Sequence, residues 1–295
     1  MKEVNFWFEE QGWRPQPFQK ACWKAYGQGQ NGMLHAPTGS GKTYALWGGI
    51  VAEAKKEQSL KKATYALWIT PLRALAVEIQ QATQRMNDAL LPATKVALRT
   101  GDTSQNLRAK QKRDPSFGLV TTPESLHVLL STKEHQTYFK QLRIVVIDEW
   151  HELLGTKRGV QVELALAYLR SFIPKLRVWG ISATLGNQEL ARTILLGATE
   201  NYSVINAKIS KNIRVKSVLP KTMERFPWRG HLGLHLLPQV LNLIEKHKST
   251  LVFTNTRAQC ELWFHALLES NPNLAGNIAM HHGSIDKKIR LWVEE

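Results

Sequence analysis

A glycine-rich segment between an apolar stretch and a helical stretch most constrains the fold of this chain. The residues Ala36-Pro37-Thr38-Gly39-Ser40-Gly41-Lys42-Thr43 follow a predicted strand at 33–36 and open a predicted helix at 42–56. This is the context of a phosphate-binding loop, in which glycines let backbone amides turn towards phosphate without a Cβ clash. The positive end of the helix dipole adds to the attraction. The segment therefore predicts an α/β domain that binds a nucleotide.

Two side chains of this loop have expected chemical roles. Lys42 would reach the β- and γ-phosphates, and the hydroxyl of Thr43 would bind Mg²⁺. Ala36 replaces the first glycine of the strict pattern, which leaves the working part of the loop intact. The alternative interpretation is a glycine-rich turn with a surface lysine. The flanking strand and helix favour the nucleotide site.

Short β-branched runs alternate with helical segments over residues 1–207. The predicted strands span 33–36, 66–70, 95–99, 118–121, 144–148 and 178–182. The predicted helices span 42–56, 72–88, 123–130, 160–172 and 188–196. Such alternation indicates crossover connections and a mostly parallel sheet. The run at 144–147 is apolar throughout, as expected of a central parallel strand.

The pattern changes after about residue 207. Residues 208–230 have no helical period, and we expect them to form a connector. A second alternation follows, with a helix at 231–247, a strand at 250–254, a helix at 257–269, a strand at 277–281 and a helix from 285. Two strands with two full helices and the start of a third cannot close a doubly wound domain. We therefore expect residues 231–295 to form only the first part of a second domain.

An acidic motif, Asp148-Glu149-Trp150-His151, ends the apolar strand. In a parallel sheet this position lies at the carboxyl edge, beside the phosphate loop. Asp148 is expected to hold Mg²⁺ through its water shell, and Glu149 to orient and deprotonate the attacking water. His151 would sit near the γ-phosphate and couple it to a neighbouring motif. A zinc site is the competing interpretation, but the second histidine of H-E-x-x-H is absent. The two motifs together argue for a nucleoside triphosphatase.

The composition bears on partners and setting. The net charge of +15, from 39 Lys and Arg against 24 Asp and Glu, favours a polyanionic partner such as nucleic acid, and a generally basic surface is the alternative. Cys22 and Cys260 are the only cysteines, which excludes a disulfide scaffold and favours a reducing cytoplasm. No run of about 18 apolar residues occurs, so we expect no membrane partner. Trp47, Trp68 and Trp179 fall at core-like positions.

Further motifs follow in an order that resembles the DExH helicases of superfamily 2. Segments similar to their motif Ia, glycine loop, motif Ib, motif III and motif IV occur at 70–75, 99–103, 121–125, 182–185 and 251–257. Gln19 resembles the adenine-reading glutamine of these proteins, and an amide can bind both N6 and N7 of adenine. The segments 148–166 and 225–240 resemble the large helicase-related (Lhr) family, most of all its bacterial ligase-associated branch.

This resemblance covers nearly the whole chain and implies a fold and an activity. It implies a RecA-like domain at 1–207, the connector, and an incomplete RecA-like domain at 231–295. It also implies an ATP-dependent DNA helicase or translocase that moves 3′ to 5′ on single-stranded DNA in repair, in the cytoplasm at the nucleoid. A DNA ligase and a metallo-β-lactamase-fold nuclease are partners by family association. An RNA helicase and a non-catalytic basic nucleic-acid-binding module stay open as alternatives.

The resemblance carries over site residues as well. ATP would be bound by Gln19, Pro37, Thr38, Gly39, Ser40, Gly41, Lys42 and Thr43. The nucleic-acid backbone would be held by Arg73, Thr100, Gly101, Thr122, Thr254 and Arg257. Solvated surface arginines are the alternative for Arg73 and Arg257. Ser182 and Thr184 would couple the two sites.

Motifs V and VI of the family do not occur in the sequence. We therefore expect the C-terminal half of its own chain as a further partner. Motif VI supplies an arginine finger that stabilises charge on the transferring phosphoryl group. Residues 1–295 are accordingly expected to bind ATP but to hydrolyse it slowly.

Overall fold

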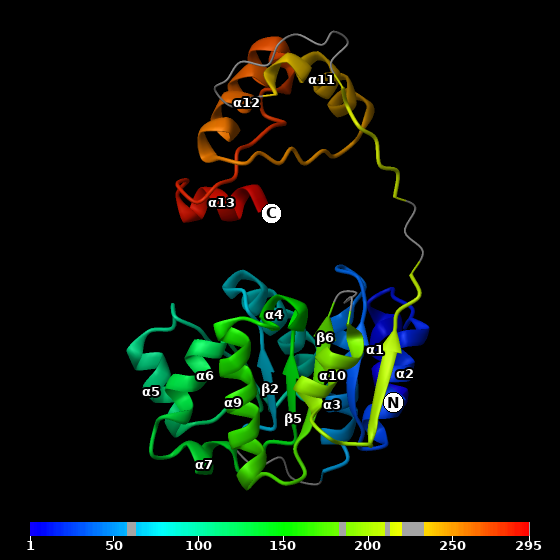
Figure 1. The fold of residues 1–295 in the computed structure, drawn as a ribbon, viewed down its shortest axis with the longest axis vertical. Coiled ribbons are helices and arrows are strands. Elements are labelled where there is room, and N and C mark those ends of the chain that lie inside the picture. The colour runs from blue at the N-terminus through cyan, green and yellow to red at the C-terminus, as the bar shows by residue number, and fades with distance from the viewer. Residues whose placement is uncertain (58–62, 183–186, 210–212, 220–232, 295) are drawn as a thin grey trace. The chain divides into compact units, whose positions relative to one another are not determined.

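The computed structural model describes residues 1–57, 63–182, 187–209, 213–219 and 233–294 (Figure 1). The chain divides into two compact units, Met1–Lys211 and Asn212–Glu295, and each is described by itself. Within these ranges, none of the helices combines the length and the apolar character needed to cross a bilayer.

A seven-stranded sheet forms the centre of the first unit, in the order β3-β4-β2-β5-β6-β1-β7. The strands are β1 Asn31–His35, β2 Ala66–Ile69, β3 Val96–Arg99, β4 Gly118–Thr121, β5 Ile144–Ile147, β6 Arg177–Ser182 and β7 Tyr202–Asn206. Each neighbouring pair in this order runs parallel. All carboxyl ends therefore meet at one edge of the sheet, and the predicted α/β fold is confirmed.

Helices cover both faces of this sheet (Figure 1). They are α1 Lys2–Glu10, α2 Pro17–Gly27, α3 Lys42–Ala54, α4 Arg73–Leu90, α5 Gln105–Arg113, α6 Pro123–Leu130, α7 His135–Phe139, α8 Trp150–Leu153, α9 Lys157–Phe172 and α10 Gln188–Leu196. Residues from α1 to α4 join one buried cluster, and residues from α6 to α10 join the other. Alternate residues of β5 enter the two clusters, which explains why every position of that strand is apolar.

The predicted core tryptophans are confirmed. Trp47, Trp68 and Trp179 are each 1% exposed or less and belong to the cluster under α1 to α4. The indole Nε1 of Trp47 donates a buried hydrogen bond of 2.8 Å to Asn87 Oδ1. A buried tryptophan usually needs such a partner for its N–H group, so α3 and α4 are joined by a polar contact as well as by packing.

Several element boundaries differ from the prediction. Helix α9 begins at Lys157 rather than at residue 160, because the hydroxyl of Thr156 accepts a hydrogen bond from the Gly159 amide and caps the first turn. Strand β7, paired with β1, was not predicted. Its alternating apolar residues are half-buried or exposed, so the sequence carries no strong burial pattern there.

The second unit has helices α11 Leu237–Lys246, α12 Arg257–Ser270 and α13 Lys287–Glu294, with short 3₁₀ turns at Leu234–Leu236 and Pro272–Leu274. The predicted strands at 250–254 and 277–281 are wrong for the described residues, where neither segment pairs in a ladder. A strand is stable only with neighbours to hydrogen-bond, and Leu251 and Phe253 are 83% and 88% exposed. Within the predicted connector, residues 213–219 form neither helix nor strand.

Candidate nucleotide and nucleic-acid sites

The phosphate loop lies between β1 and α3, as the sequence predicts. Gly39 and Gly41 adopt left-handed backbone conformations, with φ of 76° and 84°, which side-chain-bearing residues rarely take. Gly41 is the N-cap of α3, so the loop leads directly into a helix N-terminus. The buried hydroxyl of Ser40 has no hydrogen-bond partner among the described residues. A loop with this conformation and an unsatisfied polar group fits a ligand rich in hydrogen-bond acceptors, such as a phosphate chain.

Lys42, at the start of α3, and Glu149, just after β5, form an ion pair. Their Nζ and Oε1 atoms are 2.9 Å apart, and the two side chains are only 10% and 15% exposed. The residues are 107 positions apart in the chain, so the sheet alone brings them together. Glu149 has a φ of 48°, the one positive value at a non-glycine residue in the described part of the chain. Such local strain, of order 1–3 kcal/mol, is typical of functional positions.

Asp148 directly follows β5, beside this pair, and is 3% exposed. Burial raises the pKa of its carboxyl group, Lys42 lowers it, and the negative Glu149 raises it again, so that the pKa is about 6. The amide of Glu149 donates a 2.9 Å hydrogen bond to Asp148 Oδ1. A buried carboxyl group whose ionised form is disfavoured is well suited to bind a cation, because the cation restores the ionised form.

A Mg²⁺ ion could be held here by Thr43, in the first turn of α3, and by Asp148. Among the described residues, no cluster of three or more His, Cys, Asp and Glu side chains forms a complete metal cage. Mg²⁺ usually keeps several waters and uses one or two carboxylates together with substrate phosphates. One hydroxyl and one carboxylate beside a phosphate loop therefore fit Mg²⁺ bound together with a nucleotide.

His151 extends the site towards β6. Its Nδ1 lies 3.4 Å from Glu149 Oε2 and 3.4 Å from the hydroxyl of Ser182, at the end of that strand. The two predicted motifs on β5 and β6 are thus in contact through one imidazole ring. Thr184, the second predicted coupling residue, lies outside the described residues.

Gln19 lies on α2, directly against the phosphate loop. Its Nε2 donates a 3.0 Å hydrogen bond to the Gly41 carbonyl, and its Oε1 accepts a 2.8 Å bond from the Gln16 amide. Only 3% of the residue is exposed. An amide side chain has two N–H groups and two oxygen lone pairs, so one of each remains for a ligand. The contact with Gly41 was not predicted, and the sequence carries no local signal for it.

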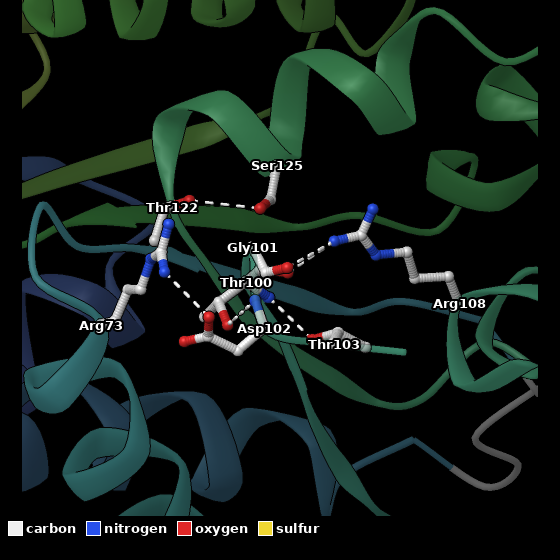
Figure 2. A network of polar contacts seen from close by, with 8 residues as sticks. All are labelled: Arg73, Thr100, Gly101, Asp102, Thr103, Arg108, Thr122 and Ser125. Carbon is white, nitrogen blue, oxygen red and sulfur yellow. Dashed lines mark hydrogen bonds and ion pairs between the residues drawn. The ribbon is translucent and has the colours of Figure 1, made fainter. Parts of the chain in front are cut away.

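The predicted nucleic-acid residues of the first unit form one group (Figure 2). Arg73, Thr100, Gly101 and Thr122 follow β2, β3 and β4 at the carboxyl edge. Thr100 and Thr122 are each only 3% exposed. The hydroxyl of Thr122 donates to Ser125 Oγ at 3.2 Å, so this side chain is already satisfied within the protein.

The structure adds residues to this group that were not predicted. Asp102 pairs with Arg73, and Arg108 donates 3.0 Å hydrogen bonds to the carbonyls of Thr100 and Gly101. Arg108 lies on α5, a helix that was not predicted, and basic residues are too common in this chain for the sequence alone to single it out.

Thr254 and Arg257 belong to the second unit. The hydroxyl of Thr254 donates to the Thr256 carbonyl at 3.2 Å, and Arg257 begins α12 and donates to Ser284 Oγ at 2.5 Å. Their proposed role in binding nucleic acid stays a prediction.

Residues 16–193 match the family model of the DEAD/DEAH box helicases. This chain belongs to the DEAD/DEAH box helicase family. The match begins just before Gln19 and ends after Ser182, so it includes the phosphate loop, the acidic motif and the loops after β2, β3 and β4. The predicted membership of superfamily 2 is confirmed.

Individual relatives of this helicase-family chain support the predicted resemblance to Lhr. It is 32% identical over 309 residues to ATP-dependent helicase Lhr-Core of Sulfolobus acidocaldarius, a match that covers 99% of this chain and 35% of that protein. Among solved structures, Mycobacterium smegmatis helicase Lhr bound to ssDNA and AMP-PNP matches with a TM-score of 0.75 and 27% identity, over 99% of this chain and 39% of that one. The chain spans about a third of the length of the curated relatives it matches.

A third comparison bears on the fold alone. The DUF1998 helicase MrfA bound to DNA matches with a TM-score of 0.77 at 18% identity, over the whole of this chain and 42% of that one. Two helicases of different sequence therefore share this arrangement of elements.

Proposed function

We propose that this chain is the ATP-binding part of a motor that moves along single-stranded DNA. The observation that carries the proposal is the strand order. The strands β5, β6 and β1 are contiguous and carry the predicted nucleotide residues, whereas β3, β4 and β2 are contiguous and carry the predicted nucleic-acid residues. Both sets lie at the carboxyl edge of one sheet. Because β5 pairs directly with β2, a movement at the end of β5 shifts the neighbouring loop after β2.

The nucleotide half can start a hydrolytic cycle through the Lys42–Glu149 pair. A γ-phosphate that takes Lys42 releases the carboxylate of Glu149, which is then free to orient a water and accept its proton. Mg²⁺, when bound by Thr43 and Asp148, neutralises phosphate charge. His151 touches both Glu149 and Ser182, so a change at Glu149 alters the end of β6. Intact Lys42, Asp148 and Glu149 disfavour a non-catalytic binding module.

The nucleic-acid half of the sheet, meaning the loops after β2, β3 and β4, offers backbone groups and the exposed side chain of Arg73. The side chains of Thr100 and Thr122 are buried. Such a surface suits a sugar–phosphate backbone of any sequence, as a translocase requires. The similar Mycobacterium smegmatis Lhr was solved with ssDNA, which favours DNA over RNA. From the resemblance we also propose 3′-to-5′ movement, a place in DNA repair at the nucleoid, and a DNA ligase and a nuclease as partners.

Salt dependence tests the backbone-binding part of this proposal. Each neutralised phosphate of a single strand contributes about −0.7 to the slope of log K against log salt concentration, so several contacts predict a slope steeper than roughly −2. The measurement is binding of a labelled oligo-thymidylate over a salt series. A flat dependence at measurable affinity would refute backbone tracking.

Steady-state hydrolysis tests the catalytic part. We propose that residues 1–295 bind ATP with Mg²⁺ but turn it over slowly, because Arg257 and Arg290 are the only arginines after residue 250 and neither stands in an arginine-finger motif. ATPase activity is measured with and without single-stranded DNA or RNA, beside Lys42→Ala as a control. Vigorous DNA-stimulated turnover that is lost in Lys42→Ala would show that these residues suffice as a motor. Stimulation by RNA alone would favour the RNA-helicase alternative.

A further inference from the structure

An ion pair links two loops of the nucleic-acid half. Arg73 Nη1 lies 2.8 Å from Asp102 Oδ1, and the two side chains are 62% and 68% exposed (Figure 2). Arg73 begins α4 after β2, and Asp102 lies in the loop after β3. Gly101 permits the approach, because a Cβ at that position would come within 2.8 Å of Arg73 Nη2. The guanidinium group therefore lies against the loop backbone, with a carboxylate on one of its terminal nitrogens.

We propose that Asp102 is a built-in competitor for the nucleic-acid backbone. Its carboxylate holds Arg73 in the free protein and gives way to a phosphate when a single strand binds. Carboxylate and phosphate are the two groups that the guanidinium fork fits best, and the N–H group of Nη1 that bonds the carboxylate is not available to a phosphate until the carboxylate leaves. The inference rests on the proposed function and adds to it a residue that sets the strength of nucleic-acid binding.

The loop that carries Asp102 is held by contacts that do not involve its carboxylate. Arg108 bonds the carbonyls of Thr100 and Gly101, and the Thr100 amide donates to Thr103 Oγ1 at 2.9 Å. The neutral variant Asp102→Asn should therefore keep the loop conformation. What it changes is the charge presented to Arg73 and to an approaching phosphate.

The exposure of the pair determines the size of the expected effect. Ion pairs between solvated side chains are weak, so a phosphate can displace Asp102 readily and removal of its charge should tighten binding about fivefold. In the wild-type complex the released carboxylate takes up a cation, which opposes the release of counterions from the nucleic acid. Asp102→Asn should therefore bind with a steeper salt slope, and its advantage should shrink as salt is added.

The test compares binding of a labelled oligo-thymidylate to the wild type, Asp102→Asn and a matched control over a salt series. The control is Asp88→Asn, which removes one negative charge from an exposed position on α4. It lies 15 residues from Arg73 along the same helix, roughly 22 Å at 1.5 Å per residue. Asp102→Asn should bind about fivefold tighter at low salt, with the steeper slope. The control should stay within about twofold of the wild type at about 0.1 M salt, where the Debye length of about 10 Å is well below that separation.

A double variant separates competition from simple repulsion. In an Arg73→Ala background, Asp102→Asn should give no gain beyond that of Asp88→Asn in the same background. An equal gain with and without Arg73 would overturn the competition. Weaker binding by Asp102→Asn would show instead that Asp102 orients Arg73 for the phosphate, and unchanged binding would also refute the proposal. A wild type that binds no single strand would refute the proposed function itself, which is a separate result.

Discussion

The variant Glu149→Gln should bind nucleotide more tightly than the wild type while losing hydrolysis. The Lys42 Nζ atom lies 2.9 Å from Glu149 Oε1, so a phosphate must displace a carboxylate to reach the lysine. Glutamine keeps the shape and one acceptor oxygen but removes the charge. The same change removes one of the influences that raise the pKa of Asp148, and thereby favours the form that binds Mg²⁺.

The magnitude follows from the nature of the contact. Lys42 stays charged in the variant, so both contacts fall in the range of about 1.5–3 kcal/mol for hydrogen bonds to charged groups, with the ion pair near the top and the bond to the neutral amide oxygen near the bottom. The side chains of Lys42 and Glu149 are largely buried, so solvent screens the difference little. Loss of the charge should therefore release about 1.4 kcal/mol of competition, which is about tenfold in nucleotide affinity.

The assay is calorimetric titration with a non-hydrolysable ATP analogue and Mg²⁺, beside steady-state ATPase measurements. Glu78→Gln, which removes the same charge from an exposed position on α4, is the matched control. Tighter binding together with lost hydrolysis separates the expected effect from misfolding, which would weaken both. Unchanged or weaker binding by a folded Glu149→Gln variant would refute the view that Glu149 competes for Lys42.

Three further variants test the nucleotide site and the fold. Gln19→Ala should weaken ATP binding about fivefold and relax the preference over GTP, since a hydrogen bond contributes about 1 kcal/mol, and competition binding with both nucleotides would measure this. Gly159→Ala should lower the free energy of unfolding by about 1–3 kcal/mol in urea titrations, because a Cβ there would overlap the backbone carbonyl oxygen of Leu153, which cannot rotate away. Burial alone would raise the pKa of Glu53, but hydrogen bonds from Arg177 and Tyr26 bring this pKa below its usual value. Its ionised form therefore stabilises the fold at neutral pH, and this stability is lost as the pH falls through the lowered pKa. Glu53→Gln should be less stable than the wild type at neutral pH, with the difference shrinking in acid.

The local features of the site were predictable from sequence, because they depend on neighbouring residues. The glycines at 39 and 41 take the left-handed conformations that a phosphate loop needs, and the chain passes from strand to helix at the expected positions. The apolar run of β5 is buried on both faces, with the acidic residues at its end. Glycine conformations and hydrophobic periods are set within a few residues, so a sequence displays them directly.

The predicted strands of the second unit show that a local sequence pattern does not always determine the structure. Residues 250–254 have the composition of a strand, yet among the described residues they pair with nothing, and Phe253 is 88% exposed. A helix satisfies its hydrogen bonds within itself, and α11 and α12 formed near their predicted positions. A strand must find its partner elsewhere in the chain, so its sequence pattern alone does not suffice.

The working contacts of the site were decided by the tertiary structure. Lys42 meets Glu149, and Arg73 meets Asp102, only because the parallel sheet brings the carboxyl ends of distant strands to one edge. The strand order then places the predicted nucleotide strands on one side of β2 and leaves β2, β4 and β3 to the nucleic-acid loops. Residue types and their spacing predict which residues bind nucleotide and nucleic acid. The pairing of opposite charges depends on which strands are neighbours in the sheet, and the periodicity of a single sequence does not encode that order.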